Sequence, residues 1–405
     1  GLLKNYISPG PLLGLLTEGI ISGVGSVIVF LPNILILFLG VSLMEDSGYM
    51  ARAAFIMDKF MHRLGIHGKS FIPLIMGFGC NVPAIMATRM LENKRDRIIT
   101  ILINPFMSCS ARLPVYVLFA GIFFNQMAGI VIISLYFIGV FLAFISARFI
   151  KVLFFKGESA PFVMELPPYR MPTAKTILLH MWNRASQYLR KMGGIILIFS
   201  VIIWVMSEYP KSPDIDVRYS TMLTNLEDSY NSRVRSAKRE NVDSNTIHQL
   251  TQNYSIKRKE LIENRNAEVI KYSFIGRIGG IVEPVLRPLG FSWQMGVSLI
   301  TGIAAKEIVV STLGILYNAT SGDEAGEQSN NLLEQELQSA SHGITPLIAF
   351  TFMLFVLLYI PCVATIIAIG KEIGWNWALF SIVYNTILTW SVCFITYNIG
   401  SLLGF

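Results

Sequence analysis

The sequence predicts an all-α, polytopic transmembrane protein built from two repeated halves, each with a broken or re-entrant helical hairpin. Of the 405 residues, 53% are hydrophobic and only 15% are charged, which is typical of membrane proteins rather than of soluble domains. Several uncharged stretches are long enough to cross a bilayer, which takes about 20 helical residues. The two halves also resemble each other, and such internal symmetry is typical of transporter folds.

Uncharged stretches mark the expected membrane helices in chain order. The stretch 113–147 is too long for one helix, and Asn125-Gln126 in its middle predicts a tight turn between two helices. The stretch 192–207 is shorter and needs help from its flanks to cross. The other expected spans are 19–44, 343–370 and 373–405.

A polar stretch, 209–271, separates the two membrane halves and contains 11 Lys or Arg and 9 Asp or Glu. It has no apolar periodicity strong enough for a core, so we expect a polar soluble loop over 209–272. The first membrane half then covers 19–208 and the second 273–405. Residues 1–18 are expected to lie on the outer face, and the chain to be a fragment of a longer protein.

The second half repeats the first at a fixed offset of 225 positions. Residues 49–77 align without a gap, from Tyr49 with Phe274 to Gly77 with Gly302. The repeat predicts two gate-like units that share one architecture.

Each copy of the repeat contains an interrupted helix. Segment 69–89 is interrupted by GFGCNVP at 77–83, and segment 294–316 by Gly302 and by Lys306-Glu307. Each half-helix has about eight to ten residues, or about 12 to 15 Å, which suits a re-entrant hairpin better than a crossing. Transporters of this kind bind substrate where broken helices of the two repeats meet.

Charge predicts the orientation. With both hairpins re-entrant, the basic residues fall on one face, which the positive-inside rule makes cytoplasmic. The opposite face carries the polar loop and the acidic segment 318–342, and Gly1 lies outside. The basic residues are Arg52, Lys59, Arg63, Arg89, Lys94, Arg95, Arg97 and those between 148 and 191.

All four cysteines lie in apolar segments, so a disulfide framework is not expected. Cysteine in a membrane helix is usually a small apolar filler, and we assign Cys393 to that role. Cys80, Cys109 and Cys362 instead stand close to prolines at interruptions. Irregular backbone at membrane depth is tolerated only where it is buried in protein or lines a cavity.

The side chains at these interruptions predict a path for a divalent transition metal. Sulfur ligands favour soft or borderline cations, and Asn, Ser and freed carbonyl oxygens complete the shell. A hard ion such as Mg2+ prefers carboxylates, which the interruptions mostly lack. The candidate metal-binding residues are Cys80, Asn81, Met107, Ser108, Cys109 and Cys362, and the residues that shape the interruptions are Gly77, Gly79, Pro83 and Pro105.

Isolated charges supply further candidates. Lys306 and Glu307 stand between uncharged runs, so we expect a role in gating or in supporting the hairpin tip; the alternative is a self-neutralising surface pair. Arg112 either acts in gating or ties down a helix end or a carboxylate. Glu45 and Asp46 end the first span and are either helix caps or a vestibule for cations.

No enzyme site is visible in the sequence. HGKS at 67–70 resembles the end of a phosphate-binding loop, but that motif requires a glycine where this chain has Arg63. The net charge of +7 is attributed to basic cytoplasmic loops, so nucleic acid is not an expected partner.

Four strings, SFIPLIMGFGCNVPAIMATR, NPFMSCSARLPVYVLFAG, LMEDSGYMARAAFIMD and GIAAKE, resemble the membrane domain of the bacterial ferrous iron transport protein B family. The resemblance implies Fe2+ uptake across the inner (cytoplasmic) membrane through two gate repeats similar to those of nucleoside transporters. It also implies that GTP and Mg2+ bind an N-terminal GTPase domain outside this chain. The family's cysteine motifs fall on Cys80, Cys109 and Cys362.

The expected partners are membrane lipid, Fe2+, the GTPase domain, small accessory iron-transport proteins and further copies of the chain. Two other functions stay open at this point. A cation-coupled carrier of an organic solute such as a nucleoside would need hydrogen-bonding groups for base and ribose at the hairpin tips. A non-transporting scaffold for a GTPase would leave the repeated interruptions without a reason.

Overall fold

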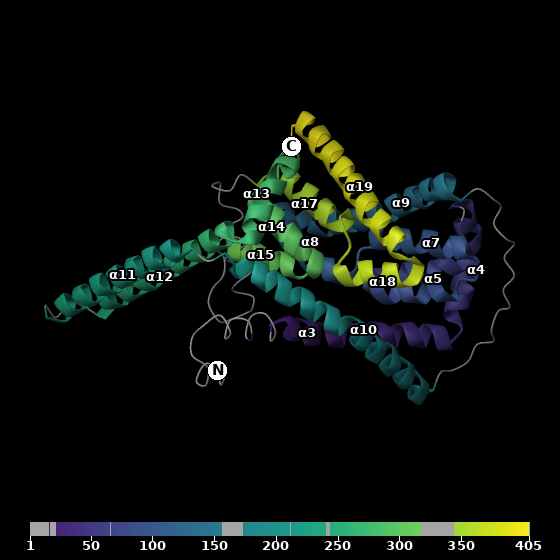
Figure 1. The fold of residues 1–405 in the computed structure, drawn as a ribbon, viewed down its shortest axis with the longest axis horizontal. Helices are drawn as coiled ribbons and strands as arrows, with labels where there is room; N and C mark the ends of the chain where they lie inside the picture. The colour runs from purple at the N-terminus through teal and green to yellow at the C-terminus, as the bar shows by residue number, and fades with distance from the viewer. Residues whose placement is uncertain are drawn as a thin grey trace. The chain divides into compact units, whose positions relative to one another are not determined.

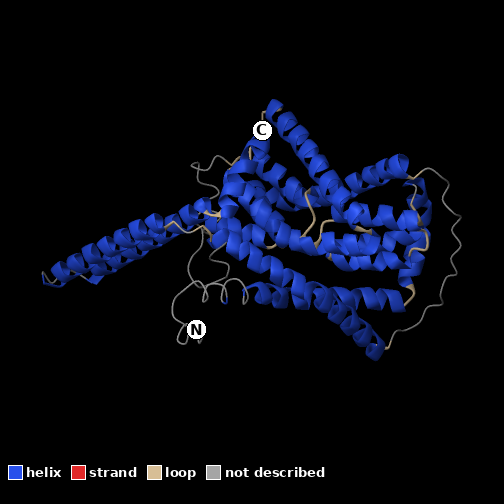
Figure 2. Ribbon diagram, in the orientation of Figure 1, coloured by secondary structure: helices blue, strands red, loops and turns tan. Residues whose placement is uncertain are grey.

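The computed structural model describes residues 16, 22–64, 66–155, 173–210, 212–239, 244–316 and 344–404, and its regular secondary structure there is helical throughout (Figure 2). The chain divides into two compact units. The first contains 1–202, 302–307 and 345–405, and the second contains 203–301 and 308–344. The acidic segment 318–342, and all but residue 16 of the outer-face segment 1–18, lie outside the described residues.

The first unit holds most of the long apolar helices (Figure 1). Its elements in chain order are α3 (Ser22–Asp46), α4 (Tyr49–Leu64), η2 (Gly68–Ser70), α5 (Phe71–Gly79), α6 (Asn81–Ala87), η3 (Thr88–Met90), α7 (Lys94–Ile103), η4 (Asn104–Phe106), η5 (Ser110–Arg112), α8 (Leu113–Phe124), η6 (Asn125–Met127), α9 (Ala128–Phe154), most of α10 (Ala174–Glu208), α17 (Pro346–Leu358), α18 (Val363–Ile373) and α19 (Trp375–Leu402).

Three stretches within the described residues are long and apolar enough to cross a membrane: Lys94–Phe154, Pro346–Ile373 and Trp375–Leu402. The predicted division of 113–147 is confirmed, because α8 ends at Phe124 and α9 begins at Ala128, with Asn125 at φ 37°. The expected span 343–370 overlaps the membrane-capable stretch Pro346–Ile373. Residues 359–362 separate α17 from α18 there, since Pro361 has no N–H to continue the helix.

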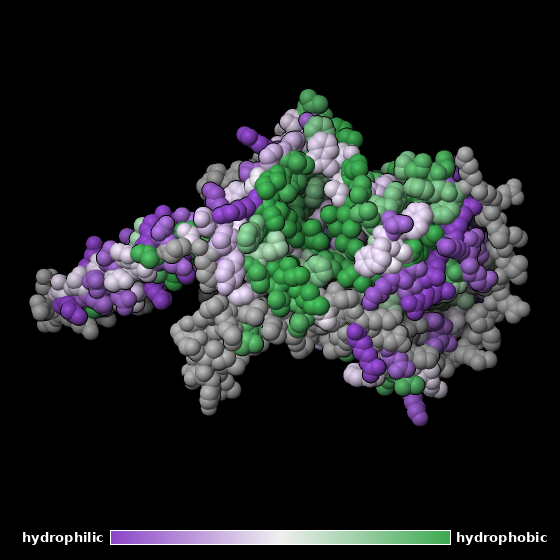
Figure 3. Space-filling view, viewed as in Figure 1, coloured by the Kyte–Doolittle hydropathy of each residue, from purple (hydrophilic) through white to green (hydrophobic). Residues whose placement is uncertain are grey.

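Side chains on the outside of this unit suit contact with lipid. Large exposed apolar residues follow one face of α9 at spacings of three and four: Ile130, Ile133, Phe137, Phe141 and Ile145. Figure 3 shows hydrophobic side chains over α9 and hydrophilic ones where Figure 1 labels α5. A helix that is apolar on its exposed side is stable when that side faces hydrocarbon.

The second unit contains the segment expected to be an irregular loop. It is mostly helical instead, with α11 (Pro213–Arg239) and α12 (Ser244–Tyr272) forming an antiparallel pair (Figure 1). Arg265 donates to Asp216 at 2.7 Å, and the rings of Tyr230 and Tyr254 stack with centroids 4.3 Å apart. An apolar stripe of α11 is also less exposed than most of the residues around it: Ile215, Tyr219, Leu223, Leu226, Tyr230 and Val234, at spacings of three and four.

The rest of the second unit is built from α13 (Phe274–Leu286), η7 (Arg287–Leu289), most of α14 (Trp293–Ala304) and α15 (Ile308–Leu316). Ile275, Val297 and Leu316 form its buried apolar cluster. Gly279 permits the close packing of α13, because a Cβ there would lie 2.4 Å from Val297 Cγ2.

Candidate functional site

The first interruption lies at Cys80, between α5 and α6. Cys80 is the single residue between the two helices, and its backbone is extended, with φ −153° and ψ 129°. Pro83 explains the interruption, because it lacks the N–H that would bond the carbonyl of Gly79 in a continuous helix. Ser110 Oγ donates to that carbonyl instead, at 3.0 Å. The freed backbone group therefore binds the next interrupted segment of the chain.

Gly77 lets α5 approach this next segment closely. A Cβ at Gly77 would lie 3.0 Å from Asn104 Oδ1 and 3.0 Å from Met107 Cβ. Asn104 Nδ2 also donates to the carbonyl of Pro73 at 3.0 Å. α5 is thus fixed against the stretch that leads to Cys109.

The second interruption covers 107–109, between η4 and η5, and Arg112 holds its backbone. The Arg112 side chain is 1% exposed; Nη1 donates to the carbonyl of Met107 and Nη2 to that of Pro105, both at 3.0 Å. Ser108 Oγ donates to Tyr116 Oη at 3.2 Å. The guanidinium satisfies carbonyls that have lost their helical partners, so Arg112 ties down unwound backbone here.

Two further interruptions meet through Lys306. Residues 305–307 separate α14 from α15, and 359–362 separate α17 from α18. Lys306 is 2% exposed; its Nζ donates to the carbonyl of Ile360 at 2.7 Å and lies 3.1 Å from the centroid of the Tyr359 ring. A cation–π contact and a carbonyl oxygen both stabilise the buried ammonium.

Cys80, Cys109 and Cys362 occupy equivalent places in their segments. Each is the N-cap residue of the element that follows, without a side-chain capping bond, and each is partly exposed. Cys80 and Cys362 both pack against the buried cluster of α6 and α18, and the bond from Ser110 to the carbonyl of Gly79 ties the segment of Cys109 to that of Cys80. The three predicted thiols thus lie at the ends of interrupted helices.

Buried cations lie beside these thiols. Lys306 bonds the carbonyl of Ile360, two residues before Cys362, and Arg112 bonds that of Met107, two residues before Cys109. Cys362 Sγ also lies 3.1 Å from Thr365 Oγ1, in the first turn of α18. Lys306 and Arg112 thus hold the backbone that leads to two of the three cysteines.

Other polar atoms near the thiols lack partners. Asn81 is 4% exposed, and its Oδ1 has no hydrogen-bond partner among the described residues; the same holds for Tyr359 Oη. Within the described part of the chain, no three His, Cys, Asp or Glu residues lie close enough to hold a metal ion. A dication here would therefore need amide, carbonyl or thioether groups beside the thiols.

The remaining candidates lie elsewhere or were missed. Glu45 and Asp46 form the end of α3. Cys393 is fully buried against α17, with Sγ 3.7 Å from the carbonyl of Thr351, as a filler would be. Tyr359 and Asn104 were not selected from the sequence, although Asn104 directly precedes Pro105 and Tyr359 lies two residues before Pro361, which was the available signal.

Two family models match the chain. The Gate model, described as nucleoside recognition, matches residues 27–123 and 189–376. The model described as the ferrous iron transport protein B C terminus matches residues 132–184. The Gate match includes every interruption described above.

Curated relatives match nearly the whole chain. A Porphyromonas gingivalis protein named Fe(2+) transport protein A/Fe(2+) transporter FeoB fusion protein is 52% identical over 99% of this chain and 46% of its own length. Proteins named Fe(2+) transporter FeoB from Methanocaldococcus jannaschii and Campylobacter jejuni are 40% and 41% identical over 99% of this chain, and 52% and 58% of their own lengths. The chain spans about half the length of these relatives, and no solved structure matches it.

Proposed function

We propose that the chain, which belongs to the Gate family, is the membrane domain of a ferrous iron transport protein B and forms the path by which Fe2+ crosses the bacterial inner membrane. The observation that supports this proposal is the position of Cys80, Cys109 and Cys362, each at the start of the element that follows an interruption. The names of the relatives agree with a ferrous substrate.

The chemistry of the cluster suits a borderline dication in a site that must also release it. Thiolate sulfur binds Fe2+ more strongly than hard ions, while Asn81 Oδ1 is a buried acceptor without a partner. Met107 and Ser108 supply thioether and hydroxyl groups beside Cys109. Because the thiols lie on separate segments, movement of one segment changes the coordination and lets the ion leave.

Short helices support the re-entrant interpretation of the first hairpin. α5 has 9 residues and α6 has 7. At 1.5 Å per residue neither covers more than about half of the roughly 30 Å of hydrocarbon.

We assign roles in gating to the residues around the thiols. The places where the backbone opens would be set by Gly77, Gly79, Pro83 and Pro105. Lys306, Glu307 and Arg112 would set when it moves, and Glu45 and Asp46 would attract the cation at the membrane edge.

The whole transporter needs parts beyond this chain. We propose that a GTPase domain, with GTP and Mg2+, biases the hairpins, and that a small accessory protein acts with it. The fusion in the Porphyromonas gingivalis relative supports the second partner. We further propose that the protein works in contact with membrane lipid and as a homo-oligomer.

Radioactive Fe2+ uptake tests the thiol assignment in cells that express the intact protein carrying this chain. Uptake should fall at least about tenfold for Cys80→Ser and for Cys109→Ser, because each loses a sulfur ligand. Cys393→Ser is the matched control, since this cysteine lies buried between α19 and α17, and its uptake should stay near wild type. Undiminished uptake by the Cys80→Ser/Cys109→Ser double variant would refute the assignment.

A nucleoside carrier is the second candidate, because the matching Gate model is described as nucleoside recognition. The cluster does not favour it: the groups at the interruptions are thiols and buried cations rather than paired hydrogen-bonding groups for a base and ribose. Calorimetry with uridine should show no binding, whereas micromolar binding would favour the carrier.

A further inference from the structure

Glu372 is a buried carboxylate held by two arginines near the end of α18. Its side chain is 5% exposed, while those of Arg89 and Arg97 are 55% and 27% exposed. Arg89 Nε donates to the two carboxylate oxygens at 2.9 and 3.0 Å, and Nη2 donates to Oε1 at 2.5 Å. Arg97 Nη2 donates to Oε2 and, at 3.4 Å, to the carbonyl of Glu372. Multiple charge-assisted bonds of this kind fix orientation as well as distance.

Arg89 and Glu372 join the two helices, α6 and α18, that begin after Cys80 and Cys362. Arg97 binds the same carboxylate from α7. Arg89 lies in η3, which continues directly from α6, and α6 begins after Cys80. Glu372 lies in the last turn of α18, which begins after Cys362. Each thiol is therefore about 13 to 15 Å of helix away from the ion-paired end.

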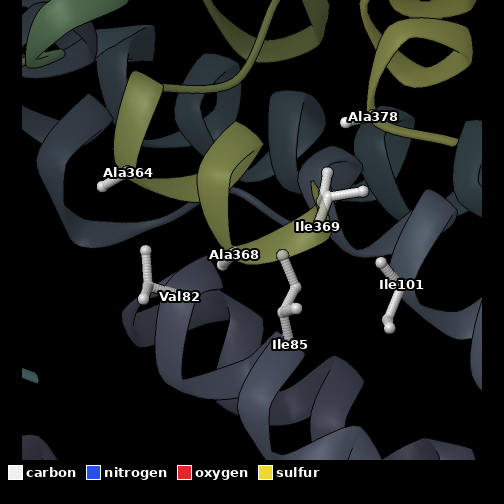
Figure 4. Close-up of a cluster of buried hydrophobic side chains, with 7 residues drawn as sticks. All are labelled: Val82, Ile85, Ile101, Ala364, Ala368, Ile369 and Ala378. Atoms are coloured by element: carbon white, nitrogen blue, oxygen red, sulfur yellow. The ribbon is translucent and has the colours of Figure 1, made fainter. Parts of the chain in front are cut away.

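Between the thiols and the ion-paired ends, α6 and α18 pack through an apolar interface, called the seam below. Val82 and Ile85 on α6 contact the side of α18 that carries Ala364, Ala368 and Ile369 (Figure 4). Alanines four residues apart on one face let two helices approach closely. A close seam transmits a shift at one end of the helix pair to the other end.

We propose that Glu372 is a positioning residue for metal transport. Its clamp with Arg89 and Arg97 holds the far ends of α6 and α18 together and thereby fixes the spacing of Cys80 and Cys362. The clamp lies among the basic residues assigned to the cytoplasmic face, so its release separates the two helices on the side where the ion leaves. The inference rests on the proposed function, because it takes these two thiols as ligands of the transported ion.

A second ion pair of this unit supplies a matched control. Lys69 Nζ lies 3.0 Å from Glu92 Oε1, but the Glu92 side chain is 88% exposed. An exposed pair of this kind contributes little to structure. Glu92→Gln therefore removes the same charge close to Arg89 in sequence without opening the seam.

The experiment measures Co2+ binding to the intact purified protein through the sulfur-to-metal charge-transfer band, in a Cys393→Ser background. Glu372→Gln should weaken Co2+ binding by about 10- to 100-fold, as expected when a group that orients metal ligands is lost. Glu92→Gln should bind within about twofold of wild type. Arg89→Gln should weaken binding less, and should add nothing in the Glu372→Gln background, because both remove one interaction.

The outcomes separate the two proposals. A wild-type protein without the charge-transfer band overturns the proposed ligands themselves. A normal wild-type band with unchanged affinity in Glu372→Gln overturns the clamp inference alone. If Glu372→Gln does not fold, Arg89→Gln decides the question, because it removes the bond between η3 and α18 and leaves Arg97 paired with Glu372: weaker Co2+ binding supports the clamp, and wild-type binding overturns it.

Discussion

Gly77→Ala tests whether close packing of α5 against the segment of Met107 sustains the cluster. The added Cβ would lie 3.0 Å from Asn104 Oδ1, 3.0 Å from Met107 Cβ and 3.2 Å from Met107 Cγ, all tighter than ordinary van der Waals contact. Asn104 and Met107 are almost fully buried, so neither can move away freely. Something in the core must shift.

The magnitude follows from two opposing effects. Overpacking of a dense interior costs about 1 to 3 kcal/mol. Alanine gains about 0.5 to 1 kcal/mol over glycine inside a helix. The net expected change is a loss of about 1 kcal/mol in the free energy of unfolding, together with displacement of Met107.

Gly121→Ala is the matched control, because Gly121 lies inside α8 and a Cβ there would meet nothing within 4 Å. This variant should gain up to about 1 kcal/mol. Unfolding of the purified protein by SDS titration in mixed micelles measures both free energies, and Fe2+ uptake reports the displacement. A Gly77→Ala variant as stable as Gly121→Ala, with normal uptake, would show that the reasoning is wrong.

Arg112→Lys should destabilise the protein by about 2 kcal/mol or more, because one ammonium cannot bridge the carbonyls of Pro105 and Met107 as the planar guanidinium does; SDS titration measures this, and unchanged stability would contradict it. The Arg218 hydrogen bond lowers the pKa of Glu268 below its ordinary value. The pair therefore stabilises the α11–α12 hairpin fully at pH values above the unfolded-state pKa of about 4.3. This stabilisation is lost as pH falls through the lower pKa that Glu268 has in the folded protein. Both side chains are exposed, so the effect is small and screened by salt; the hydrogen-exchange protection factors of α11 and α12, which correct for the intrinsic pH dependence of exchange, should fall between about pH 5 and 3, and Arg218→Gln should reduce that fall.

Much of the fold follows from local chemistry that the sequence displays. Pro83 and Pro105 lack an N–H and mark where the backbone opens, and the structure is interrupted close to both. Asn125 marks the turn between α8 and α9, because asparagine tolerates the positive φ that this turn requires. This signal, like that of the prolines, lies in a single residue. Pro361 marks the interruption inside the apolar stretch 343–370 in the same way.

The α11–α12 pair shows the opposite case. α11 has an apolar stripe that includes Ile215, Leu223 and Leu226, but the sequence of one helix does not show which helix covers it, and contacts such as Arg265 with Asp216 join residues far apart in sequence. Pairing of two polar helices depends on which side chains meet across the interface, and a single helix's periodicity does not contain that information.

By itself the sequence determined the membrane-helix class, the interruptions and the three thiols at them, because each depends on residues within a few positions of one another. Only the tertiary structure decided which distant group satisfies each freed carbonyl: Ser110 for Gly79, Arg112 for Met107 and Lys306 for Ile360. It alone also joined Glu372 to Arg89. The physical reason is that an unsatisfied buried carbonyl accepts any well-placed donor, so the choice is made by packing rather than by local sequence.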